Sequence, residues 1–374
     1  MSPYNDVELV VALAPYAGRG TVRRAGRTIP GSVAVWDASW QATESLISRY
    51  IGNDVWGQGT EMAKYRGDLP QLSSSTVMLS DSGMETDLIF HEGFDLPLFA
   101  SFTMLDDAAS TDALRNYYRR HIQVARDAHV GFLLEAATWR ASIVWARQLG
   151  LDETAVADVN RRAIDLLIQL RGDAGDMQGP MVISGLIGPR DDAYNPAQLM
   201  SADEAEGYHA AQIQTLAGTE ADLVTALTLT YTAEAIGIVR AARRARMPVV
   251  ISFTVETNGA LPDGSLLGDA IAAVEDANDS YPAYYGINCA HPSHFLSVLD
   301  SREEWTTRIK MIRANASRCS HAELDEAETL DDGDPEELGR EYAEIRERLP
   351  QINVLGGCCG TDVRHVRSIA RACI

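Results

Sequence analysis

The segment INVLGGCCGT at positions 352–361 decides the fold. It opens with an apolar run and closes in a glycine-rich turn that carries two adjacent cysteines, Cys358 and Cys359. The run is the last of a series of short segments rich in Val, Ile and Leu, which are typical of parallel strands buried on both faces. The series comprises 76–80, 131–139, 181–188, 222–229, 248–256, 284–290, 308–316 and 352–357.

Helical patterns separate these apolar segments. The stretch 112–129 aligns one apolar stripe, and 153–170 aligns another; the stripes are Leu114, Tyr118, Ile122 and Ala125, then Val156, Val159, Ala163 and Leu167. Further helices are expected at 201–218, 232–245, 267–277, 291–300, 334–349 and 361–372. Strand and helix alternating in this way predict an α/β fold, the (βα)8 TIM barrel. An open doubly wound sheet is the alternative, but no GxGxxG motif follows the first strand, which argues against a dinucleotide-binding version.

Residues 1–61 show no steady period, and regular alternation begins only near Val77. We therefore expect an irregular N-terminal extension over 1–61 and a barrel over 62–374. A chain of 374 residues suits one barrel with additions. One hypothesis is that Met62 is the biological start. The other is that 1–61 forms an arm packed on the barrel.

The composition of the chain argues against some classes of binding partner and some cellular compartments. The net charge is −21, from 53 acidic and 32 basic residues, and no basic face for nucleic acid is visible. No apolar run reaches membrane-spanning length, and the leader MSPYND has no positive charge of the kind a signal peptide needs. Five cysteines are too few for a disulfide framework, and unpaired thiols fit a reducing cytoplasm. We expect a cytoplasmic protein that binds neither nucleic acid nor membrane.

The barrel interpretation brings three thiols to one face. In this fold the chemistry lies at the carboxyl ends of the strands, and the segment 284–290 ends with Cys289 opposite Cys358 and Cys359. Adjacent strand residues point to opposite sides, but the flanking glycines let the backbone leave strand geometry. Three thiolates suit Zn²⁺ and leave one coordination position open, as catalytic zinc sites do. We expect these cysteines to be metal ligands and the catalytic centre.

Other interpretations of the cysteines and histidines stay open. Cys358 and Cys359 could form a vicinal redox couple or act as small buried hydrophobic residues. His291 and His294 follow Cys289 at the start of a helix and are expected to be surface or capping residues. The loop after the seventh strand carries Cys319 and His321, for which a gating or substrate role is open. Cys373 is next to last and is given no role.

From about Val77 to its end, the chain resembles the homocysteine S-methyltransferase family. The motifs that carry this resemblance are DSGMETD (81–87), GLIGPR (185–190), SFTVETNGALPDG (252–264), GINC (286–289) and GGCCGT (356–361). The resemblance implies a zinc-bearing (βα)8 barrel that activates a thiol for methylation, with the three cysteines above matching the zinc ligands.

The resemblance also implies a set of substrate-binding residues. Asp81 matches the acid of the first strand that helps to hold an amino-acid substrate, and Gly83 belongs to the same motif. Thr138 and Asn288 match positions that line the pocket. The chain departs from the family at Leu227, where relatives often carry a glutamate that grips the substrate amine.

Two carboxylates are candidates to replace that glutamate. They are Glu135 and Glu256, although each is equally read as an ordinary barrel-wall or rim carboxylate.

The expected function is a zinc-dependent S-methyltransferase. It would move a methyl group from a small sulfonium- or ammonium-type donor to homocysteine or a related small thiol or selenol. The alternative is a non-catalytic barrel that binds metal or senses thiol redox state. The sequence leaves the oligomeric state open, a homo-oligomer included.

Overall fold

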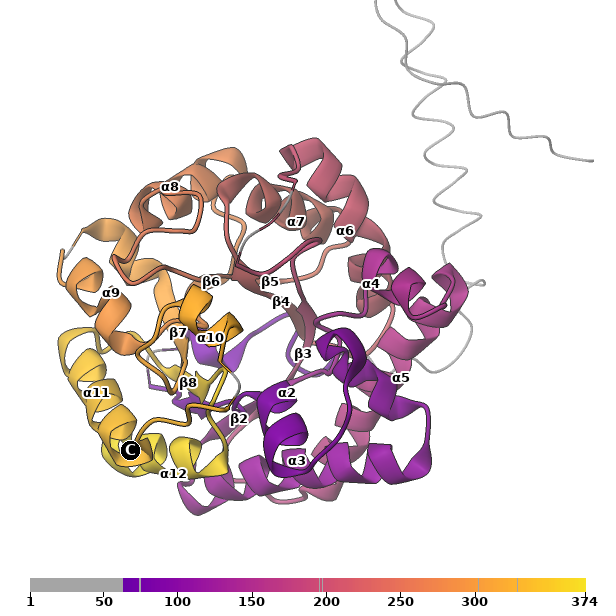
Figure 1. Ribbon diagram of the computed structural model, residues 1–374, viewed down its shortest axis with the longest axis horizontal. Coiled ribbons are helices and arrows are strands. Elements are labelled where there is room, and N and C mark those ends of the chain that lie inside the picture. The colour runs from indigo at the N-terminus through magenta and orange to yellow at the C-terminus, as the bar shows by residue number, and fades with distance from the viewer. Residues whose placement is uncertain (1–62, 74, 195, 197, 302, 328) are drawn as a thin grey trace, which may run out of the picture. The chain divides into compact units, whose positions relative to one another are not determined.

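The eight apolar segments form a closed parallel barrel surrounded by helices (Figure 1). The structure is a computed structural model that describes residues 63–374 except 74, 195, 197, 302 and 328. Each strand pairs with its neighbours in chain order, and β8 returns to β1 through Met78 opposite Val354 and Leu79 opposite Leu355. The predicted (βα)8 TIM barrel is confirmed.

The strands are β1 Met78–Leu79, β2 Gly131–Glu135, β3 Met181–Ile187, β4 Leu223–Leu229, β5 Val249–Phe253, β6 Tyr284–Asn288, β7 Ile309–Ala314 and β8 Val354–Gly357. The helices of the described residues are α2 Met84–Thr86, α3 Ala108–Asp127, α4 Ile143–Gln148, α5 Glu153–Asp173, α6 Ala202–Ala217, α7 Thr232–Arg244, α8 Leu267–Ala277, α9 Pro292–Leu299, α10 His321–Asp325, α11 Pro335–Arg348 and α12 Val363–Cys373. Shorter helical turns are η1 Pro70–Leu72, η2 Asp87–His91, η3 Pro97–Phe99, η4 Ser101–Leu105 and η5 Glu304–Arg308.

Burial explains why the apolar pattern predicted these elements. Of the strand residues, all but Lys310 are buried, as expected for parallel strands covered by helices outside and side chains inside. Both predicted helical stripes, on α3 and α5, are buried. The side chains of Asp107 and Asp152 cap the N-termini of these two helices.

The second strand is shorter than predicted. It ends at Glu135, and residues 136–142 turn across the carboxyl end of the barrel instead of continuing the strand. The prediction extended the strand to residue 139 because this turn is itself largely buried and begins with two alanines, Ala136 and Ala137.

The amino end of the barrel is closed by the segment before β1. The Nδ2 amide of Asn353, just before β8, donates to the carbonyls of Gln71, Ser73 and Thr76 at 3.0, 2.9 and 2.8 Å. The buried side chain of Leu69 belongs to the same hydrophobic cluster as Met78 of β1 and Val354 of β8. Residues 69–73, 75 and 76 thus plug the end of the barrel opposite to the cysteines.

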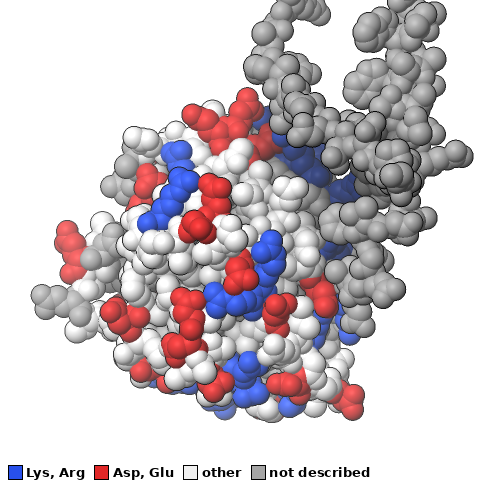
Figure 2. All heavy atoms as spheres, turned by 90° about the vertical axis from the view of Figure 1, so that its right-hand side faces the viewer, with Lys and Arg blue, Asp and Glu red and all other residues white. Residues whose placement is uncertain are grey.

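The expectations on the N-terminal extension, on membrane spans and on surface charge concern other parts of the molecule. The predicted N-terminal extension, residues 1–61, lies outside the described residues. In the described part of the chain, no helix is both long and apolar enough to cross a membrane. On the face shown in Figure 2, acidic and basic side chains are interspersed.

The closure by Asn353 generates a stability prediction. Asn353→Ala should lower the free energy of unfolding by about 2 kcal/mol, because it removes a fully buried amide whose carbonyl partners then lose their donor. Gln123→Ala, on the exposed face of α3, is the control and should change it by less than about 0.5 kcal/mol. Urea unfolding of the full chain measures both. Equal stability of the two variants would show that the plug does not depend on Asn353.

Candidate active site

Three cysteine sulfurs converge at the carboxyl end of the barrel. Cys289 follows β6, and Cys358 and Cys359 follow β8. Their Sγ atoms all lie within 4.8 Å of one another. Cys289 and Cys358 are joined as a disulfide, with Cα atoms 5.4 Å apart, whereas Cys359 is free. The strand ends thus bring three sulfurs close enough to pair as a disulfide or to share one metal ion.

The backbone leaves strand geometry where the thiols are presented. Cys289 has a φ of 53°, in the left-handed region that few side chains adopt without support. Its carbonyl accepts hydrogen bonds from His321 Nε2 at 2.6 Å and Thr254 Oγ1 at 3.2 Å. Gly360, directly after the cysteine pair, has a φ of 77°. Such positions persist only where the surroundings hold them, and they cluster at functional sites.

A second left-handed residue, Thr228, supports Cys289 from β4. The register of β4 against β5 shifts between Ala226 and Leu229, which gives Thr228 a φ of 61°. Its backbone N–H donates to Asn288 Oδ1 at 2.9 Å, and its Oγ1 donates to Cys289 Sγ at 3.7 Å. The bulge thus provides a hydroxyl donor to one of the three sulfurs.

The cysteines line a cavity of about 420 Å³. Asp81 and Gly83 line it as well, and a Cβ atom on Gly83 would lie 2.4 Å from the Cys358 carbonyl oxygen, so the close approach requires glycine. One wall is apolar and consists of Leu186, Leu227 and Trp139.

Two predicted substrate contacts, Thr138 and Asn288, lie behind the cavity wall. Both are fully buried. Thr138 Oγ1 donates to the Leu186 carbonyl at 2.8 Å, while Asn288 Oδ1 accepts from Ser252 Oγ at 2.6 Å. Any contact of these side chains with substrate stays a prediction.

A buried arginine ties together the carboxyl ends of several strands. Arg313 of β7 pairs with Asp81 at 2.6 Å and with Glu135. Its Nε donates to the Gly357 carbonyl and its Nη2 to the Ser82 carbonyl, each at 3.0 Å. Burial raises the pKa of the Asp81 carboxyl, and the Arg313 guanidinium opposes that shift.

The carboxylates proposed to replace the missing glutamate therefore have partners of their own. Glu135 is committed to Arg313. Glu256 lies 3.2 Å from His321 Nδ1.

An aromatic pair covers the third thiol. The Tyr194 hydroxyl lies 3.8 Å from Cys359 Sγ, and its ring stacks on His321 with centroids 4.1 Å apart. Burial raises the pKa of the Cys359 thiol, and the Tyr194 hydroxyl opposes the shift. His321, singled out for a gating or substrate role, thus lines the cavity, whereas Cys319 is exposed and outside its lining.

The other candidates have structural places. The His291 side chain accepts from the Ser293 N–H and caps α9, which confirms the capping expectation for that residue. His294 Nε2 bonds the Arg318 carbonyl at 3.0 Å. Cys373 ends α12, far from the cavity lining.

Sequence reasoning missed Arg313, Thr228 and Tyr194. A signal existed for Arg313, because a charged residue inside an apolar strand is costly to bury and needs a partner. No signal existed for Thr228, since its left-handed backbone arises from the bulge and not from a glycine or asparagine.

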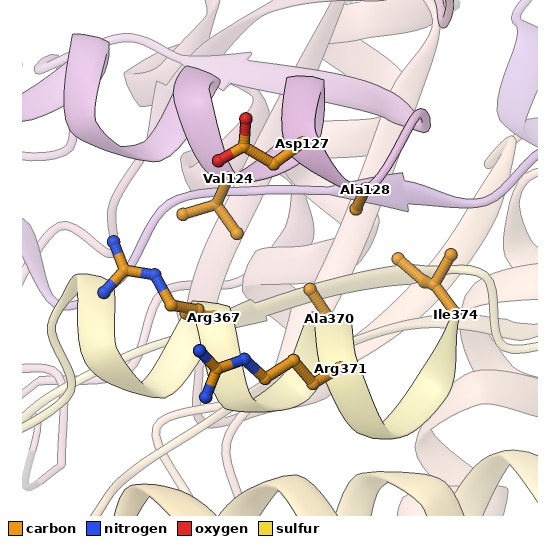
Figure 3. Close-up of a pocket in the computed structure, with 7 residues that line it drawn as sticks. All are labelled: Val124, Asp127, Ala128, Arg367, Ala370, Arg371 and Ile374. Carbon is orange, nitrogen blue, oxygen red and sulfur yellow. The ribbon is translucent and has the colours of Figure 1, made fainter.

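A second cavity, of about 480 Å³, lies between the C-terminal ends of α3 and α12 (Figure 3). The helices of the barrel are antiparallel to its strands, so the C-terminal ends of the helices lie at the amino ends of the strands. This cavity is therefore at the amino end of the barrel. Its polar side chains are Asp127, Arg367 and Arg371, and it contains no thiol. The carboxyl-end cavity is therefore the candidate active site.

The sequence of the chain is similar to that of a known enzyme family. The model of the homocysteine S-methyltransferase family matches residues 78–373. Homocysteine S-methyltransferase 4 of Zea mays is 23% identical over 78% of this chain and 88% of its own length. Methionine synthase of Mycobacterium tuberculosis is 26% identical over 82% of this chain, but the match spans only 25% of that longer protein.

Solved structures with the same fold include the homocysteine methyltransferase MmuM of Escherichia coli. Its oxidized form has a TM-score of 0.64 at 18% identity, covering 79% of this chain and 95% of that one. Its metallated form has a TM-score of 0.61 at 19% identity, covering 79% and 96%. At these identities the likeness supports the fold.

The arginine at the centre of the site generates a stability prediction. Arg313→Met should lower the free energy of unfolding by about 3–5 kcal/mol, because two buried carboxylates lose their cation. Arg318→Met is the matched control: this exposed arginine also contacts two carboxylates, and its loss should cost less than about 1 kcal/mol. Denaturant unfolding measures both. If Arg313→Met lowers the free energy of unfolding no more than the control does, the ion pairs of Arg313 do not stabilise this end of the barrel.

Proposed function

The chain belongs to the homocysteine S-methyltransferase family, and from this premise we propose that it methylates the sulfur of homocysteine or a related small thiol or selenol, using Zn²⁺ held by Cys289, Cys358 and Cys359. The observation that carries the proposal is the convergence of these three sulfurs within 4.8 Å on the wall of a cavity.

The donor set fits zinc. Cysteine sulfur is a soft ligand that zinc prefers, and three protein ligands leave a position for a substrate sulfur. The disulfide between Cys289 and Cys358 must be reduced before both sulfurs can act as ligands, which fits a reducing compartment such as the cytoplasm. When bound, the ion would supply a Lewis acid that keeps a substrate thiol deprotonated at neutral pH.

The residues of the chain shape the site for this chemistry. Thr228 donates to Cys289 Sγ at 3.7 Å, and hydrogen bonds of this kind orient a ligand and tune its charge. The apolar wall of Leu186, Leu227 and Trp139 keeps water from the reacting sulfur. We propose Asp81 and Gly83 as direct substrate contacts. Thr138 and Asn288 would support the wall from behind.

The transfer is a displacement in which charge balances. The thiolate lone pair forms the new S–CH3 bond while the bond from carbon to the donor's sulfonium sulfur or ammonium nitrogen breaks. The donor leaves neutral, and the thiol proton passes to solvent. Activation of the nucleophile by metal coordination is an established route for such steps.

The first prediction from this proposal concerns the metal. Reduced protein should hold about one zinc per chain, and Cys289→Ala, Cys358→Ala or Cys359→Ala should each lose it, because two remaining thiolates are a much weaker site. Cys319→Ala and Cys373→Ala are controls and should keep it. Elemental analysis measures zinc, and mass spectrometry of methylated thiol measures activity.

Retention of full zinc and activity by any one of the three variants would contradict the ligand assignment. Zinc binding with no methyl transfer from any sulfonium or ammonium donor would favour the non-catalytic alternative.

The second prediction concerns the substrate amine. Leu227 lies in the apolar wall, and the buried carboxylates Asp81 and Glu135 are paired with Arg313, so none of these three side chains offers an unpaired charge to an ammonium group. Homocysteine and its des-amino analogue 4-mercaptobutanoate should therefore have specificity constants within about tenfold of each other. Leu227→Glu should shift the ratio toward homocysteine, and Leu227→Met should not.

Kinetics with both thiols give the ratio for each protein. A wild-type preference for homocysteine above about a hundredfold, or about 2.7 kcal/mol, would show that another group grips the amine.

A further inference from the structure

A second arginine, Arg140, lies in the same cavity. It belongs to the turn between β2 and α4 at the carboxyl end of the barrel, and it lines the cavity together with the three cysteines. Only 8% of its surface is exposed. An arginine this deeply buried needs an explanation, because charged side chains are rarely buried without a partner.

Two indoles hold the Arg140 guanidinium in place. Its Cζ lies 4.2 Å from the ring centroid of Trp139 and 3.6 Å from that of Trp145. The indole Nε1 atoms donate to the carbonyls of Leu227 and Pro189, each at 3.4 Å. Stacking on aromatic faces fixes the plane of a guanidinium but leaves the donors on its edge available.

Not all hydrogen-bond donors of the Arg140 guanidinium have an acceptor among the described residues. Nη1 donates to the Asp191 carbonyl at 3.3 Å, and the buried Nε has no hydrogen-bond partner. Among the described residues no carboxylate forms an ion pair with it, in contrast to Arg313. Burial lowers the pKa of Arg140 to about 10, and the negative charges of Asp192 and Glu85 oppose this shift.

Two of the acids that line the cavity have partners other than Arg140. Asp81 is paired with Arg313, and Glu85 accepts from Ser101 Oγ at 2.8 Å. The Asp192–Tyr194 loop continues from Asp191, beside Arg140, to Cys359, so the guanidinium and the thiols face one space. A ligand with an anionic end at Arg140 and a sulfur near the cysteines would satisfy both.

From this geometry we propose that Arg140 is a specificity-determining residue of this site, which binds the carboxylate of one of the two substrates. The planar guanidinium matches a carboxylate with parallel N–H···O bonds. The carboxylate belongs either to the thiol acceptor or to the methyl donor, and the experiment below separates the two. The inference rests on the proposed methyl transfer for the identity of the reaction, but not for the binding itself.

The test uses two matched pairs of probes. The acceptor pair is 4-mercaptobutanoate and its amide, 4-mercaptobutanamide. The donor pair is 3-(dimethylsulfonio)propanoate and the corresponding propanamide. Calorimetry measures binding of each probe alone to the reduced, zinc-loaded full chain, and mass spectrometry measures methyl transfer. The proteins are wild type, Arg140→Gln, Arg140→Lys and the control Arg147→Gln, an exposed arginine of the neighbouring helix α4.

The expected result is a preference of wild type for the carboxylate member of one pair, by about thirtyfold, the size of a hydrogen bond to a charged group. That pair identifies the source of the carboxylate. Arg140→Gln should abolish the preference, Arg140→Lys should keep part of it, and Arg147→Gln should keep all of it.

Three results would overturn the inference. They are equal binding of acid and amide by wild type in both pairs, no binding of either acid by wild type, and a full preference in Arg140→Gln. The wild-type comparison stands even if a variant fails to fold. Methyl transfer without any carboxylate preference would refute the role of Arg140 and leave the proposed function intact. A carboxylate preference that Arg140→Gln abolishes, without methyl transfer, would support Arg140 and refute the proposed function.

Discussion

The ion pairs of Arg313 are the interaction on which the active end of the barrel depends. This one side chain of β7 reaches carboxylates at the ends of β1 and β2, and it donates to the carbonyl of Gly357 directly before the cysteine pair. Charges this deeply buried cost several kcal/mol each unless they are paired. The contacts therefore couple the closure of the barrel between β8 and β1 to the position of two candidate metal ligands.

Most of the fold could be predicted from the sequence because parallel strands buried on both faces leave apolar runs that helical patterns separate. The convergence of Cys289 with Cys358 and Cys359 followed from topology alone, since all strand ends of a barrel meet at one face. Pairings between side chains from distant strands could not be predicted. Glu135 and Arg313 each stand in an apolar run, and only the closed barrel shows that they meet.

Local backbone geometry was the other limit. The left-handed conformations of Thr228 and Cys289 are accompanied by hydrogen bonds with residues distant in the sequence, Asn288 of β6 and His321 of α10, so nothing in the adjacent sequence marks them. The buried turn after β2 was predicted as strand because it begins with Ala136 and Ala137, which continue the apolar run. This turn is where Arg140 is found, and its environment of two indoles depends on how the turn folds over the barrel end.

The bulge in β4 has a consequence for how the binding preferences of this barrel can change over time. Leu227 and Thr228 stand between the paired positions Ala226 and Leu229, so neither is opposite a residue of β5. Thr228 is held by Asn288 of β6, whereas the Leu227 side chain lines the cavity. A change of side chain at Leu227 would therefore alter the cavity wall without removing a pair between β4 and β5.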